Sequence, residues 1–295
     1  MRTLGDGLLR VRTAVPGPLM WAGQHAYSRV TTLTAPLRLK PGFVMIGAQR
    51  CGTTSLFRAL MDHPQVVAPT FHKGINYFDL NYYRGMRWYK GHFPVVEIAR
   101  LRAARYGAPL TFEASGYYMY HPFALERLTR DLPGVKLIVM LRDPVERAYS
   151  AYKHESARGF EHESFERALQ LEDDRLSGEI DRMRDDFTYE SISHRHHSYR
   201  HRGHYAEQLE RAFALVPRSQ VHVIDSGEFF SQPAREYARL IEFLGLRPFE
   251  PAFPKRNARP GGPMVEQTRQ WLQEYFAPHN ERLVALLGRP PSWAC

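Results

Sequence analysis

The chain is poor in cysteine and in long apolar stretches. It has two cysteines among its 295 residues, Cys51 and Cys295, which are too few for a disulfide framework and indicate a reducing, cytoplasmic compartment. Its apolar runs fall far short of the ~20 residues that a membrane-spanning helix needs. Asp6, Arg10 and Arg12 stand where a signal peptide has its apolar segment, so we do not expect secretion by that route.

Lysine is also scarce. Of the 40 cationic residues, six are lysines and 34 are arginines, and the formal net charge is +9. The planar guanidinium group matches phosphate, sulfate and carboxylate. This composition therefore indicates either an anionic ligand or a polyanionic partner. A codon bias toward arginine would give the same numbers, so composition alone does not decide between these explanations.

Expected strands and helices alternate along the chain. Short apolar runs predict strands at residues 43–46, 110–114, 136–141 and 221–224. Apolar stripes at helical spacing predict helices at residues 55–61, 124–128, 205–215, 234–244 and 265–287, and one from residue 145 onward. This alternation predicts an α/β fold with a parallel sheet.

Other stretches give weaker patterns. Residues 69–94 are aromatic and are expected to be loop-like, and residues 160–200 are highly charged with no clear core stripe. Residues 1–40, which contain several prolines and arginines, are expected to form an N-terminal arm. Residues 41–295 are expected to form a single domain.

A glycine loop joins the first expected strand to the first expected helix, with the sequence Gly47-Ala48-Gln49-Arg50-Cys51-Gly52-Thr53-Thr54. Its spacing is that of a phosphate-binding loop, in which backbone N–H groups and the helix dipole favour an anion. Loops for nucleoside triphosphates carry lysine after the second glycine, whereas this chain has Thr53 there and its cation earlier, at Arg50. Because Arg142 follows the strand at residues 136–141, we expect an anion site built from arginine and hydroxyl groups, without a metal. A glycine turn is by itself also common in ordinary tight turns.

A second motif, Arg142-Asp-Pro-Val-Glu-Arg147-Ala-Tyr-Ser150, is more specific. With the glycine loop, it resembles the two hallmarks of the sulfotransferases that use 3′-phosphoadenosine 5′-phosphosulfate (PAPS). Further segments resemble the bacterial and heparan-sulfate branch of that family, namely residues 77–79, 84–89, 93–94, 113–115, 202–205 and 256–259. The resemblance covers roughly residues 41–293. It implies a P-loop-type three-layer sandwich, with a central parallel sheet flanked by helices.

The resemblance also implies roles for individual residues. The 5′-phosphosulfate would lie on Arg50, Cys51, Gly52, Thr53, Thr54 and Ser55. The 3′-phosphate would lie on Arg142 and Ser150. The remaining predicted cofactor-binding residues are Tyr205, Arg256, Asn257 and Arg259, of which the last three would close over the nucleotide. Arg147 is expected to make an internal ion pair. The product would be 3′-phosphoadenosine 5′-phosphate (PAP), and no metal is expected.

The chain departs from that family at the position of the catalytic base. In the carbohydrate sulfotransferases of the branch that this chain resembles, the segment after the first helix reads Lys-Glu-x-x-Phe-Phe, and its glutamate takes the acceptor's proton. This chain has Lys73-Gly74 there. Lys73 and Arg50 are expected to assist the sulfonate. Candidate replacement bases are Glu113, which lies at a predicted strand end where α/β sheets place ligands, then His72, and also Asp79. Glu113 could equally hold a loop.

Several features leave alternatives open. The histidines between residues 194 and 204 match no specific zinc template. An aromatic group could form an acceptor cleft or simply pack in the core; its members are Tyr82, Tyr83, Trp88, Tyr89, Tyr117, Tyr118 and Tyr120. The acceptor, a small-molecule, carbohydrate or lipid-like hydroxyl or amine, and the oligomeric state cannot be read from the chain. The competing functions are a P-loop nucleotide kinase and a non-catalytic polyanion-binding protein; no nucleic-acid partner is expected.

Overall fold

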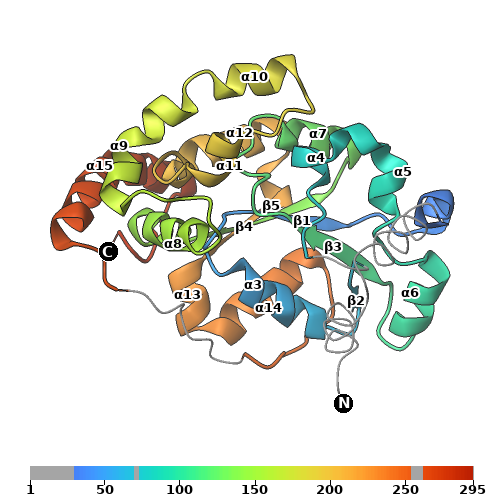
Figure 1. Ribbon diagram of the computed structural model, residues 1–295. Helices are drawn as coiled ribbons and strands as arrows, with labels where there is room; N and C mark the ends of the chain where they lie inside the picture. The colour runs from blue at the N-terminus through green and yellow to red at the C-terminus, as the bar shows by residue number, and fades with distance from the viewer. Residues whose placement is uncertain (1–29, 70–72, 254–261, 295) are drawn as a thin grey trace.

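A five-stranded parallel sheet forms the centre of the protein (Figure 1). The computed structural model describes residues 30–69, 73–253 and 262–294. The strands lie in the order β2-β3-β1-β4-β5. Their bounds are β1 Phe43–Gly47, β2 Val66–Val67, β3 Leu110–Ala114, β4 Lys136–Leu141 and β5 Val221–Asp225. The four predicted strands are confirmed, and the very short β2 was missed.

The central strands are apolar because both faces of the sheet are covered. Every residue of β1 is buried, and in β4 all but the first residue are. Such continuous apolar runs are typical of parallel sheets packed on both sides. Phe43 of β1 stacks on Phe112 of β3 with ring centroids 4.6 Å apart.

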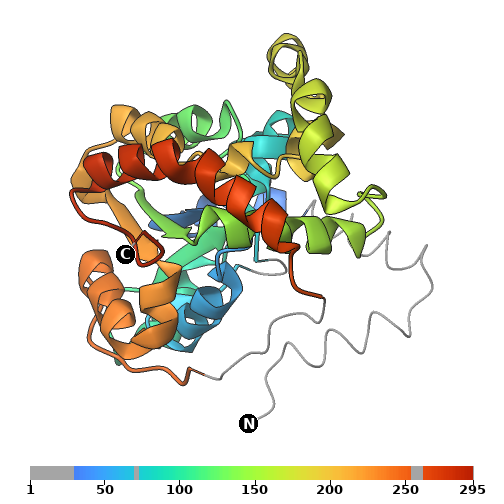
Figure 2. The same cartoon turned by 90° about the vertical axis from the view of Figure 1, so that its left-hand side faces the viewer.

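Helices cover the two faces of the sheet and give three layers, as the two views show (Figures 1 and 2). One face carries α3 (Thr53–Asp62), α13 (Ser226–Ser231) and α14 (Pro233–Leu244). The other carries α7 (Ala124–Asp131), α12 (Tyr205–Leu215) and α15 (Glu266–Leu287). The helix α8 (Pro144–Ser156) follows β4 directly. The predicted three-layer α/β fold is confirmed.

The segment at residues 69–94 was wrongly expected to be loop-like. It contains α4 (Tyr77–Leu80), the 3-10 helix η2 (Tyr82–Arg84) and α5 (Gly85–Lys90), followed by α6 (Val96–Ala103). These helices are too short to give a helical periodicity. Aromatic packing holds them in place instead: Tyr77 stacks on Tyr89 at 4.7 Å, and Phe78 packs edge-on against Tyr118 at 5.5 Å.

Residues 160–200 also pack, although no core stripe was visible in their sequence. They form α9 (Phe165–Leu176), α10 (Glu179–Asp185) and α11 (Ile192–His196), next to a second apolar cluster. Buried carboxylates supply much of the order. Glu172 accepts hydrogen bonds from the backbone N–H groups of Arg200 and His201, and Glu161 pairs with Arg175 at 2.7 Å. Charged residues therefore act here as interior partners, which an apolar pattern cannot reveal.

Short 3-10 helices complete the described fold: η1 (Ala35–Leu37), η3 (His201–Gly203) and η4 (Arg218–Gln220). The first of these lies in the part of the predicted arm that the structure describes. There, Arg38 donates a hydrogen bond to the carbonyl of Phe93 at 2.6 Å and forms an antiparallel bridge with Val95. The division into an arm at residues 1–40 and a domain at 41–295 stays a prediction.

Candidate functional site

The glycine loop turns sharply from the end of β1 into α3. Arg50 and Gly52 both have left-handed backbone conformations, with φ of 70° and 94°. A Cβ at Gly52 would also lie 2.8 Å from the ring of Phe230, so both the conformation and the space require glycine. The helix α3 begins at Thr53 with no side-chain cap on its N-terminus. The loop therefore presents the start of a helix, with its partial positive charge, to an anion.

Lys73 places its ammonium group at this helix start. Its Nζ donates hydrogen bonds to Thr53 Oγ1 at 2.9 Å and to Thr54 Oγ1 at 3.1 Å. Burial lowers the pKa of Lys73 to about 8. A largely desolvated cation thus lies beside two hydroxyl groups of the loop, where an anionic oxygen would meet all three.

The second motif lies directly beside the loop. Arg50 donates a hydrogen bond from Nε to Ser150 Oγ of α8 at 3.1 Å. Arg142, which precedes α8, lies 3.5 Å from Glu146, and Asp143 caps the helix by accepting from the N–H of Val145. The structure therefore brings together the two groups of residues that the family resemblance assigns to opposite ends of one nucleotide.

Tyr205 and Cys51 are buried behind the loop. The Tyr205 hydroxyl donates to the carbonyl of Arg142 at 2.9 Å and lies 3.8 Å from Cys51 Sγ. Burial raises the pKa of Cys51 to about 11, so the thiol is neutral at physiological pH. These side chains brace the loop against the end of β4. Their geometry favours a role in positioning the loop over the predicted side-chain contact with a cofactor.

Arg147 is internal, as expected, but its partner differs from the prediction. The side chain is fully buried and donates a hydrogen bond to the backbone carbonyl of Tyr199. This contact ties α8 to the segment before η3. Among the residues that the structure describes, the partner of Arg147 is thus a carbonyl rather than a carboxylate.

Glu113 is fully buried at the end of β3. Its Oε1 accepts from the hydroxyls of Tyr89 at 2.8 Å and Tyr118 at 3.0 Å. Its Oε2 accepts from the N–H of Ile75 and from Ser115 Oγ, each at 3.0 Å. Burial raises the pKa of this carboxyl group. Because both oxygens are occupied by these donors, the geometry favours the loop-holding role of Glu113 over that of the catalytic base.

Gly74 packs tightly against the same strand end. The N–H of Ala114 donates to the carbonyl of Lys73 at 2.8 Å. A Cβ at Gly74 would lie 2.8 Å from the carbonyl oxygen of Ala114 and 3.0 Å from Ser115 Oγ. A side chain at this position would require the backbone to move. The structure therefore has no room at residue 74 for the glutamate that the related sulfotransferases carry.

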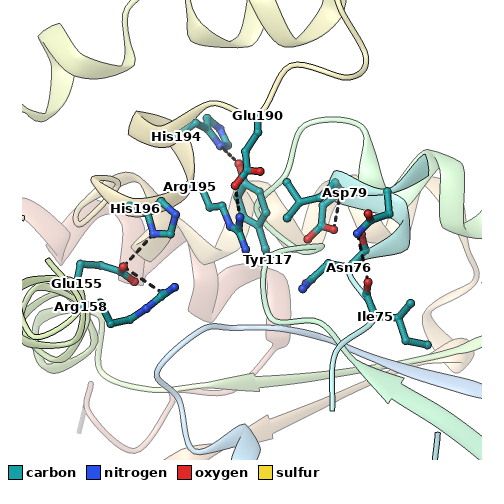
Figure 3. A network of polar contacts seen from close by, with 12 residues as sticks. Ile75, Asn76, Asp79, Tyr117, Glu155, Arg158, Glu190, His194, Arg195 and His196 are labelled. Carbon is teal, nitrogen blue, oxygen red and sulfur yellow. Dashed lines mark hydrogen bonds and ion pairs between the residues drawn. The ribbon is translucent and has the colours of Figure 1, made fainter. Parts of the chain in front are cut away.

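Asp79 lies in α4, and its carboxylate faces Tyr117 and Arg195 (Figure 3). Only 5% of the residue is exposed. Oδ1 accepts from the N–H of Leu80 at 2.7 Å, while Oδ2 is buried and has no hydrogen-bond partner among the described residues. Burial raises the pKa of Asp79 to about 7.

Tyr117 connects this carboxylate to the glycine loop. Its hydroxyl is 2.7 Å from His194 Nδ1, and the guanidinium of Arg202 lies 4.8 Å from the centre of its ring. Arg202 in turn donates a hydrogen bond to Gln49 Oε1 in the loop. Gln49 belongs to the glycine loop but was given no role from the sequence, and no motif in the chain signals Phe230.

The aromatic group is divided between packing and this site. Tyr89 and Tyr118 are buried and bind Glu113, whereas Tyr83 is exposed on the outside of η2. Tyr117 and Tyr120 lie beside His194, onto which the ring of Tyr120 stacks at 4.3 Å. The acceptor cleft stays a prediction.

The predicted residues His72, Arg256, Asn257 and Arg259 lie outside the described residues. Among the histidines that are described, His196 pairs with Glu155 at 2.9 Å. His204, Glu207 and His279 have side-chain ligand atoms within 4.8 Å of one another. The rings of His204 and His279 stack face to face at 3.8 Å, so both could not direct a nitrogen at one ion without rotation.

Comparison with known proteins identifies the family. The family model described as the sulfotransferase domain matches residues 40–256, so the chain belongs to the sulfotransferase family. The chain is 29% identical to the sulfotransferase from Alicyclobacillus acidocaldarius, covering 86% of this chain and 98% of that one with a TM-score of 0.64. The resemblance to PAPS-dependent sulfotransferases is confirmed at the level of the family.

Curated relatives agree with this family. Membrane-associated sulfotransferase kil1 of Dictyostelium discoideum is 29% identical over 320 residues, covering 86% of this chain and 66% of that protein. Bifunctional heparan sulfate N-deacetylase/N-sulfotransferase 4 of Mus musculus is 28% identical over 296 residues, covering 86% and 31%. The chain thus spans about two thirds of the first protein and a third of the second. Within its described part, no helix has both the length and the apolar character to span a membrane.

Proposed function

We propose that this protein transfers a sulfuryl group from PAPS to a hydroxyl or amine group of a small-molecule, carbohydrate or lipid-like acceptor and releases PAP. The observation that carries the proposal is the 3.1 Å hydrogen bond between Arg50 and Ser150, which brings the two predicted anion-binding motifs into direct contact. A single ligand with phosphate groups at both ends of an adenosine would fit such a pair of motifs.

The donor would bind along this junction. The loop from Arg50 to Ser55, with Lys73 beside its hydroxyls, would hold the 5′-phosphosulfate. Arg142 and Ser150 would hold the 3′-phosphate, since charge-assisted hydrogen bonds suit a phosphate. Arg256, Asn257 and Arg259 stay predicted to close over the nucleotide.

The chemistry is an in-line displacement at sulfur. An acceptor oxygen or nitrogen attacks the sulfur while the bond from sulfur to the bridging phosphate oxygen breaks. Arg50 and Lys73 would stabilise the charge that develops on the bridging oxygen and the sulfuryl oxygens, and the start of α3 would add its dipole. Holding donor and acceptor in line contributes the remaining part of the catalysis.

The proposal is tested by mass spectrometry on acceptors incubated with PAPS and the protein. A gain of one sulfuryl group on an acceptor, together with PAP formation, supports it. Thermal-shift measurements separate the alternatives. PAP should stabilise a sulfotransferase, Mg²⁺-dependent ATP turnover would instead identify a kinase, and stabilisation by heparin or DNA but not PAP would identify a polyanion-binding protein. A cytoplasmic location stays a prediction that rests on the low cysteine content.

A further inference from the structure

The sulfuryl transfer proposed above needs a group that removes the acceptor's proton, and Gly74 cannot supply one. Glu113 holds four hydrogen-bond donors, which occupy both of its carboxylate oxygens. The acceptor's proton must therefore go to another group near the glycine loop.

Asp79 has a carboxylate oxygen available for this role. Its Oδ2 is buried without a hydrogen-bond partner in the described part of the chain, while Oδ1 is fixed by the N–H of Leu80. A buried carboxylate oxygen normally has a partner. An unpaired one in a cluster of polar side chains is a position where a ligand's hydroxyl group can donate.

The helix that carries Asp79 is held firmly at the same strand end as Lys73. The N–H groups of Tyr77 and Phe78 donate to the Tyr118 hydroxyl at 2.8 and 3.3 Å, and Asn76 N–H donates to Ser115 Oγ at 3.1 Å. Tyr118 and Ser115 both bind Glu113. One buried carboxylate thus positions both the segment that bears Lys73 and the helix that bears Asp79.

The side chains around Asp79 contact residues that bind the glycine loop. Figure 3 shows its carboxylate turned toward Tyr117 and Arg195, with the Asn76 side chain entering the same region from below. Tyr117 contacts Arg202, which binds Gln49 of the glycine loop. Asp79 is therefore linked to Gln49 of the glycine loop through two neighbouring side chains, Tyr117 and Arg202.

The environment also suits proton transfer. Charged and titratable groups of several elements act on Asp79: Glu113 of β3, Tyr117 and Tyr118 of the following turn, Arg127 of α7 and Arg195 of α11. Burial outweighs the attraction of Arg195 and raises the pKa of Asp79 to about 7. A carboxylate with this pKa is a stronger base than an exposed one and is substantially ionised at neutral pH.

We propose that Asp79 is the general base of this protein and that its Oδ2 accepts the proton of the acceptor's hydroxyl group. This inference rests on the proposed sulfotransferase function. As the acceptor oxygen forms its bond to sulfur, the S–O bond to the donor phosphate breaks and its electron pair leaves with PAP. The acceptor's proton passes to Asp79, so the step requires no further reactant.

The test compares Asp79→Asn with the unaltered protein, with PAPS as donor and 2-naphthol or water as acceptor. We expect kcat to fall about 10²- to 10⁴-fold, while the affinity for PAP changes less than threefold. The limb of kcat/KM that rises with pH around 7 should disappear, and Asp79→Glu should restore part of the activity. Asp131→Asn is the matched control, because that carboxylate, at the end of α7, has partners on both oxygens: it accepts from the Tyr82 hydroxyl at 2.9 Å and pairs with Arg130 at 3.4 Å.

The outcomes are distinguishable. If the unaltered protein neither transfers nor hydrolyses PAPS and does not bind PAP, the proposed function fails. If it is active but Asp79→Asn keeps its rate, or loses rate while the limb near pH 7 remains, Asp79 is not the base and the inference is overturned.

Discussion

Arg50 in the glycine loop and Ser150 in α8 are one hundred positions apart in sequence, yet Arg50 Nε lies 3.1 Å from Ser150 Oγ. The contact arises because β1 and β4 are adjacent parallel strands, so their carboxyl ends deliver both motifs to one edge of the sheet. Ligands that span both motifs should therefore bind more tightly than ligands that reach only the loop.

Substitution of Arg142 tests the 3′-phosphate end of the site. Arg142→Ala should weaken PAP binding tenfold to a hundredfold, since a hydrogen bond to a charged group contributes about 1.5–3 kcal/mol. Binding of adenosine 5′-monophosphate, which lacks the 3′-phosphate, should stay within twofold of the unaltered protein. Isothermal titration calorimetry measures both. The exposed Arg167 of α9, which donates to Gln170, provides the control Arg167→Ala. Equal losses for both nucleotides would contradict the assigned role.

Removal of the Lys73 ammonium group tests the part of the proposed site that would hold the 5′-phosphosulfate. Lys73→Met should lower kcat/KM for PAPS on the order of a hundredfold, because one preorganised cation beside the transferring group is lost. In the unaltered protein kcat/KM should fall as pH rises through about 8, where Lys73 loses its proton. This alkaline limb should be absent from Lys73→Met and present in the control Lys90→Met on α5. Persistence of the limb in Lys73→Met would assign it to another group.

The pattern of strands, the glycine loop and the Arg142–Ser150 motif could be predicted from sequence because each depends on local spacing. The hydrogen-bond partners of the buried polar side chains could not be predicted. Glu113 looked like a candidate base from its place at a strand end, but its four donors come from residues 75, 89, 115 and 118, and only the fold brings them together. Similarly, the partnerless oxygen of Asp79 depends on how α4 packs, and this helix is too short for periodicity to reveal.

Glu113→Gln distinguishes the positioning role from a catalytic one. Three of the four donors to Glu113 are hydroxyls that can reorient, but the N–H of Ile75 cannot, so an amide whose nitrogen faces that N–H leaves the contact unmade. We expect a loss of about 1–3 kcal/mol in the free energy of unfolding, measured with urea. Activity should fall without any change in the limb near pH 7. Disappearance of that limb with unchanged stability would instead identify Glu113 as the base.

Gly74→Ala tests whether the lost glutamate could be restored. The new Cβ would lie 2.8 Å from the Ala114 carbonyl oxygen, so we expect a destabilisation of about 1–3 kcal/mol in urea unfolding. Gly74→Glu should be at least as unstable and should not raise activity. Gly262→Ala is the control, since no atom lies within 4 Å of its Cβ position. A stable and more active Gly74→Glu would mean that the backbone at the end of β3 can move far enough to accommodate the side chain.

Asp79→Asn should make the protein more stable while making it less active. Burial raises the pKa of Asp79 from 3.8 to about 7, so the folded state binds a proton that the unfolded state has already released in this range. The unaltered protein therefore loses stability as pH rises from about 4 to 7, whereas Asp79→Asn lacks this contribution. The stability difference in favour of Asp79→Asn should grow across that interval and level off above pH 7. Urea unfolding at pH 5, 6, 7 and 8 measures it, with Asp131→Asn expected to show no such trend. A difference that stays constant with pH would mean that Asp79 is ionised at all four values and is held by a partner rather than kept available for a proton.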